Sequence, residues 1–239
     1  SRKCTKRPVM VVPYGGRIYS TRQYIEDYIV DQIEAGVSNP WGHDLFEPSH
    51  YLADIVWECI SRVIVSARTV MDWLQEISSK ISAENLPVIW ETPTKFLVHQ
   101  LYPETRSRRI TTYIDNSLVK PQVREQNFGK SDRRRSVNGA SPNFIHSMDS
   151  AAMTKTINAC VDAGIRDFSM VHDSYGVHTS DIPTLYELTR MAFVDMYEYN
   201  DVLDEFKQCA LEVLDDVPEP PQKGDLELSQ VRDSAYFFA

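Results

Sequence analysis

The sequence has no run of about 18 consecutive apolar residues, so it lacks the pattern of a membrane-spanning helix. It also has no internal repeat and no low-complexity tract. Cysteine is scarce: the four cysteines of this 239-residue chain lie far apart, which excludes the usual metal-ligand spacings and indicates a reducing compartment. With 42% hydrophobic and 25% charged residues, the composition is that of an ordinary globular protein, large enough for one large domain or two small ones.

Acidic residues are absent from the first 25 positions, which include six basic residues. Residues 102–135 are basic as well, with nine basic and four acidic side chains. The net charge of −9 comes mainly from residues 181–239, which have four basic and fourteen acidic side chains. Because a polyanion responds to local basic stripes rather than to the mean charge, the overall acidity does not exclude a nucleic acid as partner.

The basic start of the chain has a regular spacing. Arg2, Lys6, Met10 and Tyr14 are each four residues apart, and side chains at that spacing lie near one face of a helix. This face would present two cations, a thioether and a phenol, and its unpaired charge suits a triphosphate. The alternative is a solvated basic turn, because two prolines fall within the stretch and proline is costly inside a helix.

The pattern Arg-x-x-x-Lys-Arg-x-x-Met-x-x-x-Tyr-Gly over residues 2–15 resembles the fingers-helix signature of the single-subunit, bacteriophage-type RNA polymerases. The resemblance reappears at Pro-Asn-Phe-Ile-His-Ser (142–147), at His-Asp-Ser (172–174) and at the final Phe-Phe-Ala (237–239). The related A-family DNA polymerases share the Arg, the Lys and the Tyr-Gly. They usually carry an aromatic residue at the position of Met10 and Glu at the position of Ser174.

The resemblance implies an α+β, mainly helical fold that comprises parts of the fingers and palm of a right-hand polymerase. Residues 1–140 would form the fingers portion, with a promoter-specificity hairpin at about 102–135, and residues 141–239 the C-terminal part of the palm. In the family, a first catalytic aspartate and the promoter-binding N-terminal region precede the fingers helix. We therefore expect the C-terminal portion of a DNA-directed RNA polymerase, inactive by itself.

The partners that the resemblance implies are double-stranded promoter DNA, the RNA transcript, nucleoside triphosphates (NTPs) and the missing N-terminal part of the same polymerase. No membrane partner is expected. The implied location is the cytoplasm of an infected bacterial host.

Nucleotidyl transfer in the family uses two Mg²⁺ ions and two aspartates, of which the resemblance places one, Asp173, in this chain. It assigns the triphosphate to Arg2 and Lys6, and makes Lys6 the proton donor to pyrophosphate. The resemblance also implies that Arg7 adds positive potential and that Tyr14 helps to choose ribose over deoxyribose. Met10 and Gly15 would shape the nucleotide pocket, and His146 would make a contact near the ribose.

Apolar periodicity predicts helices at residues 21–35, 49–81, 183–199 and 202–214, with Gly36 ending the first, and a short hairpin at 88–101. Another helix is predicted at 141–163, with Ser141 as N-cap, Pro142 at the first helical position and Gly164 at the C-terminal cap. A strand at residues 168–171, a tight turn at 172–176 and a second strand at 177–179 are predicted, with Asp173 on the turn. The apolar Met170 and Val171 favour a buried strand that would hold this carboxylate rigidly.

Residues 102–135 read as a basic β-ribbon, with a turn at the turn-forming pair Asp115–Asn116. Such a ribbon can enter a DNA major groove. Position in the family hairpin makes Arg109, Thr111 and Lys120 candidates for reading bases. The alternative is a disordered basic loop that contacts only phosphates.

Two other functions remain open. One is an A-family DNA polymerase fragment, against which Met10 and Ser174 argue. The other is a non-catalytic DNA-binding module.

The aromatic end of the chain is expected to be packed. Tyr236, Phe237 and Phe238 should lie against the palm, because exposing them would cost about 25 cal/mol per Å² of apolar surface.

Overall fold

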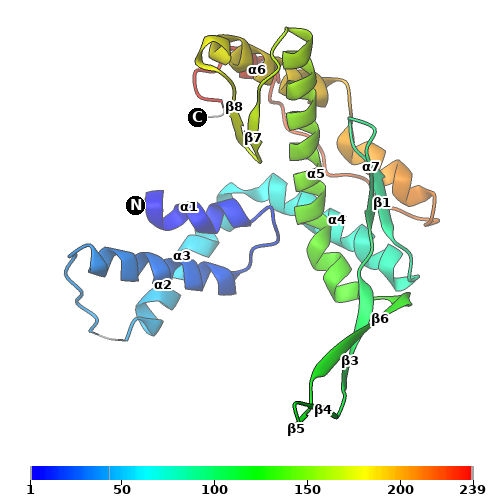
Figure 1. The fold of residues 1–239 in the computed structure, drawn as a ribbon. Coiled ribbons are helices and arrows are strands. Elements are labelled where there is room, and N and C mark those ends of the chain that lie inside the picture. The colour runs from blue at the N-terminus through cyan, green and yellow to red at the C-terminus, as the bar shows by residue number, and fades with distance from the viewer. Residues whose placement is uncertain (1, 43, 238–239) are drawn as a thin grey trace. The chain divides into compact units, whose positions relative to one another are not determined.

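The computed structural model describes residues 2–42 and 44–237, and it is an α+β structure in which helices predominate (Figure 1). The predicted fold class is therefore confirmed at this level. The strands of the described residues form two-stranded antiparallel sheets: β1 (Val88–Glu91) with β2 (Leu97–Gln100), β3 (Pro103–Arg109) with β6 (Gln122–Ser131), β4 (Thr112–Ile114) with β5 (Ser117–Val119), and β7 (Ser169–Val171) with β8 (Ser174–Gly176). The chain divides into two compact units, Ser1–Gln75 and Glu76–Ala239.

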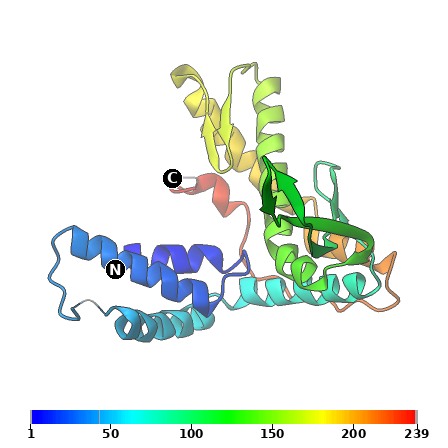
Figure 2. The same ribbon diagram turned by 60° about the horizontal axis from the view of Figure 1, so that its bottom comes forward.

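The first unit is helical. It contains α1 (Arg2–Val11), α2 (Ile18–Glu34), α3 (Phe46–Val63) and the beginning of α4 (Val65–Ala83). Figures 1 and 2 both show α1 beside α2. Its core is apolar and draws on all three complete helices and the turn after α1: Cys4, Val12, Ile25, Ile29, Ala53, Val56 and Ile60.

Two helix predictions in this unit need correction. The helix predicted at 21–35 starts earlier, at Ile18, because the Ser20 hydroxyl accepts a hydrogen bond from the Arg17 amide (3.1 Å) and caps it there. Gly36, with φ +88°, ends it as predicted. The single helix predicted at 49–81 is two helices, α3 and α4, separated at Ile64 (φ −104°, ψ 61°). Three consecutive β-branched residues at 63–65 have low helix propensity, which favours the break there.

The second unit is built around α5 (Arg133–Asp162). The predicted hairpin is present as β1–β2. It packs beside α5 and buries Trp90, whose indole Nε1–H donates to the Ser147 hydroxyl (2.9 Å). The Trp90 ring also contacts Phe144 of α5 and Phe206 of α7 (Val202–Leu211). Figure 1 shows the long ribbon formed by β3 and β6 extending away from α5. At its base the Asp132 amide donates to Tyr102 O (2.8 Å), and the Asn143 side chain of α5 donates to the Tyr102 hydroxyl (3.0 Å).

Helix α5 starts eight residues earlier than predicted. The Asp132 carboxylate accepts from the Arg135 amide (3.1 Å) and caps the helix, so Pro142 lies inside it rather than at its first position. The C-terminal end is as predicted: α5 ends at Asp162, and Gly164 has φ +95°. The predicted division between fingers and palm portions, at residues 140 and 141, falls within α5 and remains a prediction.

Helices α6 (Ile182–Glu198) and α7 confirm the two helices predicted near the end of the chain. A 3₁₀ turn, η1 (Thr179–Asp181), precedes α6, and a short helix that was not predicted, α8 (Gln230–Asp233), follows α7. Met196 of α6 packs on Ala151 and Ala152 of α5. Among the described helices, none combines the length and apolar character needed to cross a membrane.

Candidate active site and nucleic-acid interface

The predicted cationic face of α1 is present in the first unit. Arg2, Lys6 and Met10 are exposed, whereas Cys4 and Pro8, half a turn away, are buried. The helix tolerates Pro8 because the ring is buried in packing, which offsets the hydrogen bond that proline cannot donate. Among the described residues, neither Arg2 nor Lys6 has a carboxylate partner. The face therefore keeps its positive charge available for an anion.

Tyr14 does not lie on the helix, which corrects the predicted four-residue face. Helix α1 ends at Val11, and Tyr14 and Gly15 lie in the turn that follows, where their amides donate to Val11 O and Val12 O (both 3.1 Å). Gly15 has φ +80°, a conformation in which other residues are strained. Tyr14 is 38% exposed, so its phenol lies at the surface just beyond the cationic face.

Arg7 has a different setting from Arg2 and Lys6. It lines a small pocket of about 280 Å³ between α1 and α2, together with Lys3, Cys4, Tyr24, Tyr28, Asp31 and Gln32. Arg7 is nevertheless exposed and has no ion pair among the described residues. Its charge adds to the potential of the same helix.

In the second unit, Asp173 lies on the two-residue turn between β7 and β8, where Val171 pairs with Ser174. Asp173 lies on a turn, as predicted, but this turn is shorter than the predicted residues 172–176, and the second strand is β8 (Ser174–Gly176) rather than residues 177–179. His172 takes φ +52° to close the turn. The strand is not buried as expected: Val171 is 61% exposed, and Asp173 is exposed as well. The hairpin is held from its base instead, where Phe168, Met170, Tyr175 and Val177 pack on the core formed by Cys160, Ile165 and Leu185.

The surroundings of Asp173 are acidic. The pKa of the Asp149 carboxyl on α5 is raised above its usual value. Desolvation by the surrounding protein is the main cause; the nearby charge of His146 acts to lower this pKa, and that of Asp173 acts to raise it. Burial, followed by the charges of Asp149 and Asp173, raises the pKa of Tyr175 to about 12. His146, one turn before Asp149, is thus within electrostatic reach of it, and its contact near the ribose stays a prediction.

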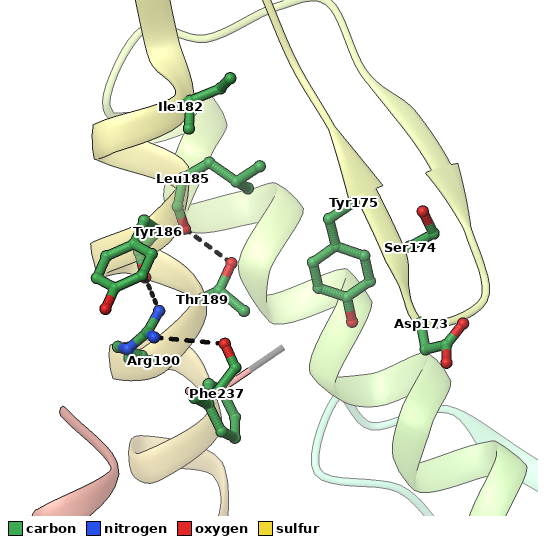
Figure 3. A pocket seen from close by; sticks show the side chains of 9 residues that line it. All are labelled: Asp173, Ser174, Tyr175, Ile182, Leu185, Tyr186, Thr189, Arg190 and Phe237. Atoms are coloured by element: carbon green, nitrogen blue, oxygen red, sulfur yellow. Dashed lines mark hydrogen bonds between the residues drawn. The ribbon is translucent and has the colours of Figure 1, made fainter. Parts of the chain in front are cut away.

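A pocket of about 610 Å³ adjoins the turn. Figure 3 shows Asp173, Ser174 and Tyr175 on one side and residues of α6 on the other. The residues from α6 and from the segment after α8 that line it are Ile182, Leu185, Tyr186, Thr189, Arg190 and Phe237. Phe237 packs edge-on against Phe193 (ring centroids 4.9 Å apart), which supports the expectation that the aromatic end packs against its neighbours. Tyr236, in contrast, is 87% exposed, and Phe238 and Ala239 lie outside the described residues.

The donor set at Asp173 fits a magnesium ion only in part. No group of three or more His, Cys, Asp or Glu side chains able to hold a metal occurs among the described residues. One carboxylate in an acidic, exposed setting is nevertheless suitable, because Mg²⁺ is commonly held by one or two carboxylates, several waters and substrate phosphates. Asp173 can therefore supply one protein ligand of such a site.

The predicted basic ribbon is also present. Arg109, at the end of β3, pairs with Gln122 of β6, and the Ile110 amide donates to Pro121 O (3.0 Å). Thr111 and Lys120 lie opposite each other between this bond and the Thr112–Val119 pair of the tip hairpin. The ladder thus brings Arg109, Thr111 and Lys120 together, all exposed, and the disordered-loop alternative is not what the structure shows.

The tip turn at Asp115 and Asn116 has φ of +48° and +59°, as suits a tight hairpin turn. Large apolar side chains are exposed along the tip and the two long strands: Ile110, Tyr113, Ile114, Leu118, Val123 and Phe128. A two-stranded ribbon with neither face covered is marginal alone, so this composition suits a surface that meets a partner.

Sequence reasoning missed two residues in the surroundings of Asp173, namely Asp149 and Arg190. Asp149 follows His146 by three residues on a helix, and that spacing could have identified it as a neighbour. No local pattern pointed to Arg190, which reaches the pocket through contacts with residues more than forty positions away.

Comparisons with known proteins agree with the motifs. The sequence model of the DNA-dependent RNA polymerase family matches residues 1–215. The chain is 30% identical to T7 RNA polymerase of Escherichia phage T7, over 100% of the chain and 29% of that polymerase. It is 32% identical to the DNA-directed RNA polymerase of Pseudomonas phage phiKMV, over 100% of the chain and 28% of that polymerase. The mitochondrial DNA-directed RNA polymerase 1 of Nicotiana sylvestris is 30% identical, over 99% of the chain and 23% of its own length.

Proposed function

Since the chain belongs to the phage-type DNA-dependent RNA polymerase family, yet spans less than a third of the three relatives just described, we propose that it supplies the nucleotide-binding helix, one catalytic aspartate and the promoter-reading hairpin of such a polymerase. The substrates would be NTPs and the template double-stranded promoter DNA. The parts would belong to the fingers and palm of a right-hand polymerase fold. A bacterial cytoplasm stays a prediction, because organellar polymerases are among the relatives.

The observation that carries the proposal is the cationic face of α1. Arg2 and Lys6 are exposed side by side on a helix whose opposite face is buried, and no carboxylate of the described residues neutralises them. Such a face binds a triphosphate through charge-assisted hydrogen bonds. The ammonium of Lys6 can also pass a proton to the pyrophosphate as it leaves. Tyr14, at the surface beyond the helix, can pair its phenol with a 2′-hydroxyl and so favour ribose.

Asp173 would hold a magnesium ion from its exposed turn. When bound, metal ions of this kind stabilise the attacking and leaving oxygens of an in-line phosphoryl displacement. The turn fixes the position of the carboxylate because β7 and β8 are paired, and because the base of this hairpin packs on the core formed by Cys160, Ile165 and Leu185. His146 and Asp149, one turn apart on α5, complete the electrostatic environment on this side.

The test is Asp173→Asn in the polymerase that contains this chain. Promoter affinity is expected to stay near that of the wild type, and runoff transcription to fall by several orders of magnitude because a metal ligand is lost. Asp167→Asn is the matched control: Asp167 is a 78% exposed carboxylate just before β7, and its loss should leave transcription unchanged. Transcription by the Asp173→Asn enzyme within tenfold of wild type would contradict the proposal.

A non-catalytic DNA-binding module remains the second candidate, and the exposed basic ribbon is the observation that favours it. Such a module would bind DNA with a steep dependence on salt but show no magnesium-dependent binding of nucleotides. An A-family DNA polymerase would instead incorporate dNTPs in preference to NTPs. Nucleotide incorporation by the wild-type enzyme separates these cases.

A further inference from the structure

Arg190 of α6 is a charged residue in a place where charge is costly. It is 3% exposed, and no carboxylate of the described residues forms an ion pair with it. An arginine cannot lose its proton to escape burial, so its guanidinium must be satisfied by other groups. Figure 3 shows it between Tyr186 and Phe237.

The groups that satisfy it are backbone carbonyls and an aromatic ring. The guanidinium donates to Tyr186 O (3.0 Å), to Ser234 O (3.0 Å from Nη2 and 3.3 Å from Nε) and to Phe237 O (3.3 Å). It also stacks on the Tyr186 ring, 3.4 Å from the centroid. The Tyr186 hydroxyl donates to Ser234 O as well (3.3 Å). One buried side chain thereby binds α6 to residues 234–237.

The segment has no regular secondary structure, because residues 234–237 follow α8 outside any helix or strand. A buried guanidinium needs several acceptors, and the fork of an arginine can bind more than one carbonyl at once. Arg190 meets that need with the carbonyls of Ser234 and Phe237. It is therefore a buried polar link between this segment and α6.

The segment matters because of where it lies. Phe237 lines the same pocket of about 610 Å³ as Asp173, Ser174 and Tyr175. We propose that Arg190 is a positioning residue: it fixes residues 234–237 as a wall of the pocket beside Asp173, and in this way supports the chemical step without contacting the nucleotide. The inference rests on the proposed function, since it assumes that Asp173 is catalytic.

The experiment uses the whole polymerase and measures single-nucleotide addition. Arg190→Gln is expected to lower kcat about tenfold, since misplacing a group near the reaction centre has a large effect on rate. KM for NTPs and promoter affinity should stay within about twofold, because a positioning residue acts on the chemical step and not on binding of either ligand. Arg190→Lys keeps the charge but loses the fork, and should restore kcat only in part.

Arg232→Gln is the matched control. Arg232 also links α8 to α6, through an ion pair with Asp195 (3.0 Å), but among the described residues its side chain donates no hydrogen bond to residues 234–237. It should leave kcat unchanged. If both substitutions lower kcat equally, or if the loss of activity follows the melting temperature across the variants, the role of Arg190 is structural and the inference is overturned.

Two further variants keep the test decisive if Arg190→Gln does not fold. Tyr186→Ala removes the stacking ring from a side chain that is 47% exposed, so the fold should survive while kcat falls. Phe237→Ala combined with Tyr186→Ala should be no worse than the single changes if both act through the same segment. Additive losses, or an unchanged kcat in Tyr186→Ala, would refute the positioning role.

Hydrogen exchange gives a readout that does not depend on catalysis. Amides of residues 235–237 should exchange faster in Arg190→Gln and Tyr186→Ala than in the wild type, and at the wild-type rate in Arg232→Gln. If exchange is unchanged, the segment is not held by Arg190, and the inference fails whatever the activity. If the wild-type polymerase adds no nucleotide at all, the proposed function fails. Whether Arg190 holds residues 234–237 in place is still decided by the exchange measurement.

Discussion

At the scale of single residues, the turn after α1 shows how one glycine can present a neighbouring side chain. Gly15 takes φ +80°, and the amides of Tyr14 and Gly15 bond back to the end of the helix. Tyr14 is thereby held at the surface in the turn that follows α1. A phenol held in one place can discriminate between sugars, which a mobile one could not do.

Tyr14→Phe tests this role in the complete polymerase. The change keeps the ring and removes the hydroxyl, so discrimination against dNTPs should relax while total activity falls only modestly. The measurement is the ratio of ribonucleotide to deoxyribonucleotide incorporation on one template. An unchanged ratio would reduce Tyr14 to a packing residue.

At the scale of elements, the register of β3 and β6 sorts the basic residues of the ribbon onto two faces. Arg109 lies opposite Gln122 and Ser107 opposite Arg124, so one face carries only hydrogen-bonding side chains there. Arg108, the next residue along the strand, points to the other face, opposite Val123. The ribbon therefore offers an internal comparison between neighbouring arginines.

Arg109→Ala is expected to cost about 1–3 kcal/mol of binding free energy on the cognate promoter and much less on unrelated DNA, as loss of a base contact does. Arg108→Ala, on the opposite face, should weaken both complexes alike or neither. Titrations of the polymerase on the two DNAs at one salt concentration measure both effects. Equal losses for Arg109→Ala on cognate and unrelated DNA would make it a phosphate contact.

Helix α7 begins with a cap that is sensitive to pH. Partial burial alone would raise the pKa of Asp201, but hydrogen bonds from Lys223 (2.7 Å) and the Asp204 amide (3.3 Å) outweigh it and lower the pKa. A lowered pKa in the folded state means that the ionised carboxylate stabilises the fold above its unfolded pKa of about 3.9, and that this stabilisation is lost as the pH falls through the folded value.

Asp201→Ala should therefore lower the free energy of unfolding by about 1 kcal/mol near pH 7, mainly through the lost cap. The difference from wild type should shrink below about pH 4, where the wild-type carboxylate is protonated too. Denaturant melts of the polymerase at pH 7 and at acid pH measure it, with a probe that reports on this unit. A difference that does not depend on pH would show that the charge contributes nothing.

At the scale of the whole molecule, the chain spans 29% of the length of T7 RNA polymerase. Under the proposed function it supplies one catalytic carboxylate, Asp173, and so only part of a catalytic apparatus. Its basic ribbon, by contrast, is a complete hairpin with its own tip turn. Binding of DNA and chemistry on nucleotides should therefore separate.

The chain expressed as residues 1–239 should bind DNA with a strong dependence on salt, because its contacts are cationic, and should add no nucleotide to a primed template. Filter binding at several salt concentrations and a primer-extension assay with magnesium test the two halves. Circular dichroism establishes first that the chain is helical. Magnesium-dependent extension by this chain alone would contradict the expectation.

Local sequence determined much of this protein. The spacing of Arg2, Lys6 and Met10 predicted the exposed face of α1, and the Asp115–Asn116 pair predicted the tip turn of the ribbon. Gly36 and Gly164 marked the ends of two helices. These features depend on neighbours within about four residues along the chain, through helical periodicity, turn chemistry and capping, so they can be read without a fold.

Tertiary structure decided what depends on distant residues. Pro142 could have started a helix, but the cap at Asp132 and the packing of Phe144 on Trp90 and Phe206 keep it inside α5. The hairpin that bears Asp173 is held by its base rather than by a buried strand. Arg190 binds carbonyls more than forty residues away. The burial of a side chain, and the partners that it then needs, are set by segments that meet only when the chain has folded, because packing is governed by distance in space and not by spacing in sequence.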